Sequence, residues 1–94
     1  MTDAELLTML KADVEIIAAN TTKDEYLGNL ITAAKQYITR EGATLDLDLM
    51  EDCNLVVMYA AWLYRKRAED APAMPRMLRW ALNNRIFSEK VSAE

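Results

Sequence analysis

The chain has 94 residues, of which 52% are hydrophobic and 28% charged, and it contains only two glycines and two prolines. This length suits one domain with a single core, and the composition excludes a disordered chain while favouring helices. With no histidine and one cysteine, Cys53, the chain lacks the usual residues of metal binding and acid–base catalysis. We therefore predict one non-enzymatic, all-α domain over residues 1–94, a small bundle of about four helices.

The net charge of −4 is unevenly distributed along the chain. Residues 1–52 carry eleven acidic and four basic residues, whereas residues 53–94 carry four acidic and seven basic residues. These charges are spread through periodic segments rather than gathered in one block. The asymmetry therefore indicates either solvated helix surfaces or attraction between subunits.

The most hydrophobic stretch is LVVMYAAWLY, residues 55–64, which has no charged or amide side chain. It is about half as long as the roughly 20 residues that a membrane-spanning helix requires. The chain also does not open with the basic, apolar and small residues of a secretory signal. We therefore expect an intracellular protein that does not interact with a membrane.

Hydrophobic periodicity and capping patterns predict four helices and a C-terminal tail. The helices span roughly residues 2–12, 22–41, 48–68 and 75–84, and the tail spans 85–94. Thr2 with Glu5 and Thr22 with Glu25 match the capping box, in which a hydroxyl and a carboxylate cap the first backbone amides reciprocally. These two pairs predict where the first and second helices begin.

One of the two glycines follows the end of the second helix, and the other lies inside it. Gly42 follows its last residues, where a residue in the left-handed conformation commonly ends a helix. Gly28 lies inside the helix, where glycine costs about 1 kcal/mol relative to alanine. It is either a tolerated defect, which we favour, or a place where another backbone approaches closely.

The third helix has acidic residues at its start and basic residues at its end, as the helix dipole favours. Asp46 or Asp48 is placed to cap it, with Glu51 completing a capping box. Its apolar residues form two arcs on the helical wheel. The main arc, which we predict to face the core, consists of Leu49, Cys53, Val56, Val57, Ala60, Leu63 and Tyr64.

The second arc lies nearly opposite the first. It consists of Leu55, Met58, Tyr59 and Trp62. A helix that is apolar all round must be covered all round, and three other short helices offer limited cover. We therefore predict that this arc is an interface between subunits.

The fourth helix is predicted to begin at Pro75 and to end at Asn83 and Asn84, which tolerate left-handed geometry. Its core face is expected to contain Met77, Leu78, Ala81 and Leu82. The tail of residues 85–94 is then either flexible or docked on a partner. The residues predicted to dock on a neighbouring protein are Trp80, Arg85, Ile86 and Phe87, and the alternative is that Trp80 and Phe87 pack on the third helix.

No group of residues indicates a catalytic, cofactor or metal site. The carboxylate clusters are explained by helix starts, and Cys53 lies on the main apolar arc, as expected of a small core residue. The basic residues of the second half are candidates for contact with DNA in a channel, or for charge pairs between subunits. They are Arg65, Lys66, Arg67, Arg76 and Arg79.

The order of elements resembles the head-tail connector family of long-tailed phages and prophages, also called head completion or adaptor proteins. The similarity covers about Glu5 to Lys90, and its most specific parts are the segment LITAAKQYI, residues 30–38, and the run YAAWLYRKR, residues 59–67. These are patterns of helix surface rather than catalytic motifs. No site residue can therefore be carried over from the family.

The resemblance implies a structural virion protein with neither enzymatic activity nor a cofactor. Such a protein forms a homo-oligomeric ring of about twelve copies, which needs two different complementary surfaces on each subunit. The ring would lie between the portal protein and the tail-completion or head-closure protein, around the channel through which packaged DNA passes. We expect it at the head–tail junction of the virion, and in the bacterial cytoplasm during assembly.

An alternative function belongs to a different class. The protein would be a small helical regulator or DNA-binding protein that uses the arginine-rich region 65–85. Its acidic composition, with a sequence pI near 4.8, argues against this alternative.

Overall fold

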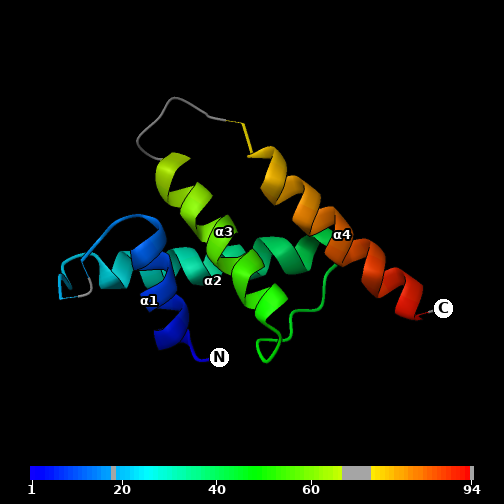
Figure 1. Cartoon of the computed structure of the whole chain (residues 1–94), viewed down its shortest axis with the longest axis horizontal. Helices are drawn as coiled ribbons and strands as arrows, with labels where there is room; N and C mark the ends of the chain where they lie inside the picture. Colours follow the sequence, from blue (N-terminus) through cyan, green and yellow to red (C-terminus); the bar gives the residue numbers. More distant parts are fainter. Residues whose placement is uncertain (18, 67–72, 94) are drawn as a thin grey trace.

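The computed structural model describes residues 1–17, 19–66 and 73–93, with the backbone alone for 91–93. These residues form four α-helices and no strand, which confirms the predicted all-α bundle. The helices are α1 (Asp3–Asp13), α2 (Asp24–Glu41), α3 (Met50–Lys66) and α4 (Arg76–Ala93). Figure 1 shows α1 and α3 crossing the same side of α2, with α4 beyond α3 near the C-terminal end of α2.

The start of α1 confirms the first capping box. The hydroxyl of Thr2 accepts from the amide of Glu5 at 3.2 Å, and the Glu5 carboxylate accepts from the amide of Thr2 at 3.1 Å. Hydrogen bonds from the backbone and the hydroxyl of Thr2 lower the pKa of Glu5 below its usual value. The sequence therefore determines this helix start locally.

The second capping box is absent, and the prediction that α2 begins with it is wrong. Thr22 instead donates to the side chain of Asn20, from its amide at 3.1 Å and from its hydroxyl at 2.8 Å. The helix begins at Asp24 after Lys23, which provides no side-chain cap. The amide and the hydroxyl of Thr22, which the predicted capping box would use, are engaged instead in this local turn with Asn20.

The end of α2 confirms the role predicted for Gly42. This residue has a φ of 118°, and its amide donates to the carbonyl groups of Ile38 and Thr39. At Gly28, by contrast, an added Cβ would meet no atom within 4 Å. No described backbone approaches it closely, so the interpretation as a tolerated defect stands.

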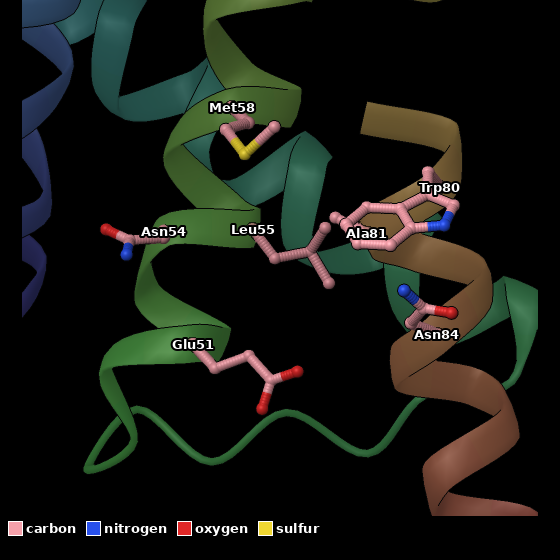
Figure 2. Close-up of a pocket in the computed structure, with 7 residues that line it drawn as sticks. All are labelled: Glu51, Asn54, Leu55, Met58, Trp80, Ala81 and Asn84. Carbon is pink, nitrogen blue, oxygen red and sulfur yellow. The ribbon is translucent and has the colours of Figure 1, made fainter. Parts of the chain in front are cut away.

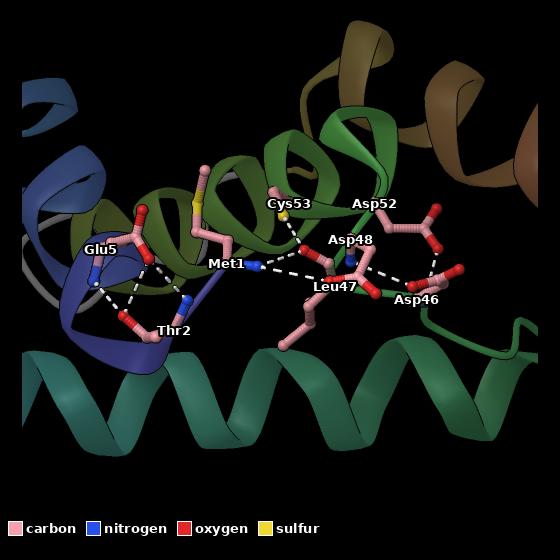
Figure 3. Close-up of polar contacts among 8 residues, drawn as sticks. All are labelled: Met1, Thr2, Glu5, Asp46, Leu47, Asp48, Asp52 and Cys53. Carbon is pink, nitrogen blue, oxygen red and sulfur yellow. Dashed lines mark hydrogen bonds and ion pairs between the residues drawn. The ribbon is translucent and has the colours of Figure 1, made fainter.

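A loop ordered by aspartate side chains connects α2 to α3 (Figure 3). The amide of Asp46 donates to Asp52 at 2.7 Å, and the carboxylate of Asp46 accepts from the amide of Asp48 at 3.0 Å. The carbonyl of Leu47 accepts from the Met1 nitrogen at 2.7 Å and from the thiol of Cys53 at 3.1 Å. The amide of Asp48 donates to Asp46 rather than to Glu51, so the capping box predicted for the third helix is absent, and α3 begins at Met50, two residues later than predicted.

The fourth helix differs most from the prediction. It does not end at Asn83 and Asn84 but continues to Ala93, so the predicted tail over 85–94 is helical as far as the description extends. Leu82 is fully buried and Ile86 packs beside Gly42. This packing sustains the helix through two residues of low intrinsic helix propensity. Residues 67 and 68, predicted to end the third helix, lie outside the described residues.

The core lies where α1, α2 and α3 meet, and α4 adds two leucines to it. The buried side chains come from every helix and include Leu6, Leu10, Leu27, Ile31, Ile38, Cys53, Val56, Ala60, Leu78 and Leu82. Cys53 is therefore the core residue that its position predicts. None of the described helices is long and apolar enough to cross a membrane.

Candidate interaction surface

A groove with mostly apolar walls lies between α3 and α4 and has a volume of about 450 Å³. Figure 2 shows Leu55 and Met58 of α3 facing Trp80 and Ala81 of α4 across it. Glu51, Asn54 and Asn84 form its polar rim. We call it the α3–α4 groove. Apolar walls with a few polar groups at the edge are typical of a surface that binds a side chain of another molecule.

A second hollow of about 240 Å³ adjoins the groove, because Met58 lines both. Trp62, Arg65 and Met77 line it, with Asp13 at its edge. The indole nitrogen of Trp62 is buried and has no hydrogen-bond acceptor among the described residues. The two hollows together extend along most of the α3–α4 boundary.

An exposed apolar stripe lies on α4 beside this groove. Met77, Trp80 and Phe87 are 68%, 63% and 69% exposed, respectively. They are spaced by three and seven residues, so they lie on one side of the helix. The core-facing residues Leu78 and Leu82 lie on the other side. We call Met77, Trp80 and Phe87 the α4 stripe.

Several large apolar side chains exposed on one side of a helix are uncommon on a protein that remains a monomer. Single exposed apolar residues are normal, but a patch of large ones marks a place of contact with another molecule. Aromatic residues contribute most to such contacts, because each buries about 150–250 Å². The α4 stripe and the α3–α4 groove share Trp80, and together they form one candidate interaction surface.

The structure corrects the predicted subunit interface on α3. Leu55 and Tyr59 are 2% and 6% exposed, so they belong to the core and offer almost no surface. Tyr59 stacks on Tyr37 of α2, with ring centroids 5.9 Å apart, and its burial raises the pKa of its hydroxyl. Met58 and Trp62 are half-buried along the groove. The helix is covered all round largely by its own chain.

The prediction that Arg85 docks on a neighbour is also corrected. Its Nε donates at 2.7 Å to Asp52, which is fully buried, and its Nη2 donates at 2.7 Å to the carbonyl of Thr44. The bond to Asp52 raises the pKa of Arg85 above its usual value. Arg85 therefore fastens α4 to the α2–α3 loop and to the start of α3.

Glu89 extends this network by one turn. It accepts from the amide of Thr44 at 2.6 Å and lies 3.5 Å from Arg85. Hydrogen bonds from the side chain and the backbone of Thr44 lower the pKa of Glu89. Of the four residues predicted to dock on a neighbour, only Trp80 and Phe87 are widely exposed, and Ile86 is half-buried.

The basic residues of the second half are mostly engaged within the chain. Arg65 pairs with Asp13 at 3.0 Å, and Arg79 pairs with Glu41 at 2.8 Å. Lys66 lies 5.0 Å from the ring centroid of Trp62. Arg76 is exposed and has no ion-pair partner among the described residues, and Arg67 lies outside them.

These pairs bear on the charge asymmetry of the sequence. Arg65, Arg79 and Arg85 belong to the basic half, and each pairs with a carboxylate of the acidic half. Part of the predicted attraction between the two halves is therefore intramolecular. Arg65 links α3 to α1, Arg79 links α4 to α2, and Arg85 links α4 to the start of α3.

Among the exposed apolar residues that the sequence did not reveal are Met77, Leu49 and Met50. Met77 was assigned to the core face of the fourth helix, but it is exposed, since Leu78 and Leu82 take that face. Leu49 and Met50 are 47% and 57% exposed at the start of α3. Leu49 was expected in the core, and the aspartate-ordered loop turns it outward.

The rest of the described surface contains weaker candidates for a binding site. A hollow of about 630 Å³ is lined only by Lys35, Gln36, Thr39 and Arg40 of α2, so no second element encloses it. No three histidine, cysteine, aspartate or glutamate side chains of the described part group together as a metal site.

Comparison of the chain with protein-family models, curated proteins and solved structures found no match.

Proposed function

We propose that this protein is a structural subunit that assembles with copies of itself, as the head-tail connector of a phage or prophage particle. The observation that carries the proposal is the α4 stripe, three large apolar side chains exposed beside the α3–α4 groove. Burying them in an assembly contributes about 25 cal/mol for each Å² of apolar surface removed from water. A subunit of a larger particle needs such a surface.

The phage setting is supported by the sequence similarity of residues 30–38 and 59–67 to the connector family. In this proposal a ring of about twelve copies lies between the portal and the tail-completion protein, around the DNA channel. The protein acts by contact alone, without catalysis or a cofactor. Its location is the head–tail junction of the virion.

Sequence-specific DNA binding has weaker support. Proteins that bind DNA rely on free basic side chains to neutralise phosphates and to read guanine. Arg65, Arg79 and Arg85 are paired with carboxylates of the same chain. In the connector proposal DNA passes near the protein but is not read.

The experiment is sedimentation velocity of the purified chain over a range of concentrations, followed by electron microscopy of the associated fraction. The proposal predicts self-association that rises with concentration and closed rings in the images, alone or with a portal protein added. It also predicts no preference among duplex DNA sequences at physiological salt. A chain that stays monomeric at every concentration and binds one duplex selectively would overturn it.

A further inference from the structure

The flank of the α4 stripe that faces away from the α3–α4 groove is basic. Arg76 lies one turn before Trp80, and Lys90 lies three residues after Phe87, so both are neighbours of the stripe on the helix surface. Both are exposed, and neither has an ion-pair partner among the described residues. Whatever covers the stripe therefore meets unpaired positive charge at its edge.

This charge argues against pairing of two α4 helices through their stripes. An antiparallel pair centred on the stripe brings Arg76 of one copy near Lys90 of the other, and a parallel pair brings each base near its equivalent. Like charges placed opposite each other in an interface are unfavourable. The occupant should instead be apolar and acidic.

The chain itself presents a segment of this kind, residues 46–51, which we call the acidic segment. Asp46, Asp48 and Glu51 are exposed, and the segment contains no basic residue. Leu49 and Met50 lie between these acids and are 47% and 57% exposed. It therefore has both the apolar side chains and the charge that complement the α4 stripe.

The acidic segment is also held in a fixed shape before any partner arrives. The carboxylate of Asp46 accepts from the amide of Asp48, and the amide of Asp46 donates to the buried carboxylate of Asp52 (Figure 3). Arg85 also donates to Asp52. A segment that is ordered in advance loses less conformational entropy on binding. It is an effective ligand for a surface on another copy.

We infer that the α4 stripe of one copy binds the acidic segment of a second copy, with Leu49 and Met50 covering Trp80 and Phe87, and with Asp48 and Glu51 facing Arg76 and Lys90. This inference rests on the proposed self-assembly and names its two surfaces. The two surfaces consist of different residues, and Glu51 of the acidic segment also lies on the rim of the α3–α4 groove. Repetition of the contact with one rotation builds a ring or a filament.

The test is a charge exchange followed by sedimentation velocity. The first variant is Arg76→Glu with Lys90→Glu, and the second is Asp48→Lys with Glu51→Lys. Each variant alone opposes like charges across the contact and should be monomeric where the wild type associates. An equimolar mixture should associate again, since each stripe then meets a segment of opposite charge. Circular dichroism of each variant checks that it is folded.

A matched control distinguishes the proposed contact from general attraction between charged proteins. Glu15→Lys with Glu25→Lys carries the same net charge as the second variant, but its changes lie at exposed positions away from the acidic segment. Alone, it should associate as the wild type does, because its α4 stripe and its acidic segment are intact. If the control is monomeric like the second variant, or if the mixture of the first and second variants stays monomeric while the wild type assembles, the inferred contact is wrong and self-assembly stands. A wild type that is monomeric throughout overturns both.

Discussion

At the scale of single residues, the pair formed by Arg85 and Asp52 determines where α4 lies. Asp52 is fully buried and accepts from Arg85 and from the amide of Asp46, so these two partners offset the cost of its burial. From the sequence, Arg85 was expected in a tail, since Asn83 and Asn84 were interpreted as a helix end. The pairing joins residues 33 positions apart, and no local pattern reveals such a contact.

Replacing Arg85 with alanine should be strongly destabilising. Removal of one partner of a buried ion pair leaves the other charge unpaired, at a cost of about 3–5 kcal/mol. Arg76→Ala is the matched control, because this arginine is exposed, and its change should stay within about 0.5 kcal/mol. Urea denaturation followed by circular dichroism at low protein concentration measures both. A loss of less than about 1 kcal/mol for Arg85→Ala would contradict the structural role given to this pair.

At the scale of helices, the sequence predicted those features that depend on neighbouring residues. The capping box of α1, the left-handed end of α2 at Gly42 and the existence of all four helices follow from local patterns. The prediction of a second capping box was wrong because the amide and the hydroxyl of Thr22 donate to Asn20 instead. The predicted length of α4 was wrong because contacts with other parts of the chain stabilise this helix beyond Asn84. Intrinsic helix propensity does not include such contacts.

The two glycines of α2 should respond in opposite directions to alanine. Gly28→Ala should stabilise the protein by about 0.5–1 kcal/mol, because the site is an open position within a helix. Gly42→Ala should destabilise it by about 1–2 kcal/mol, because its φ of 118° disfavours a residue with a Cβ. The free energy of unfolding in urea provides the comparison. A shift of the same sign in both variants would contradict this assignment.

At the scale of the whole molecule, the candidate interaction surface was only partly visible in the sequence. Trp80 and Phe87 were identified because they lie off the main apolar face of the fourth helix, and both are exposed. Leu55 and Tyr59 were wrongly assigned to an interface, because the sequence does not show that α2 and α4 cover the second arc of α3. The groove beside Trp80 depends on how α3 and α4 pack, which is a tertiary property.

The central claim is that the α4 stripe mediates assembly, and its most direct test is the association state of Trp80→Glu. Trp62→Glu is a poorer choice, since Trp62 is half-buried against the core and its replacement perturbs folding. Ile17→Glu is the matched control, because Ile17 is 76% exposed before α2 and outside the stripe.

Sedimentation velocity over a concentration series measures the association of the three proteins. The account predicts that the wild type and Ile17→Glu associate alike, while Trp80→Glu remains a folded monomer with an unchanged helical spectrum. Association of Trp80→Glu at wild-type concentrations, or equal loss in Ile17→Glu, would contradict it.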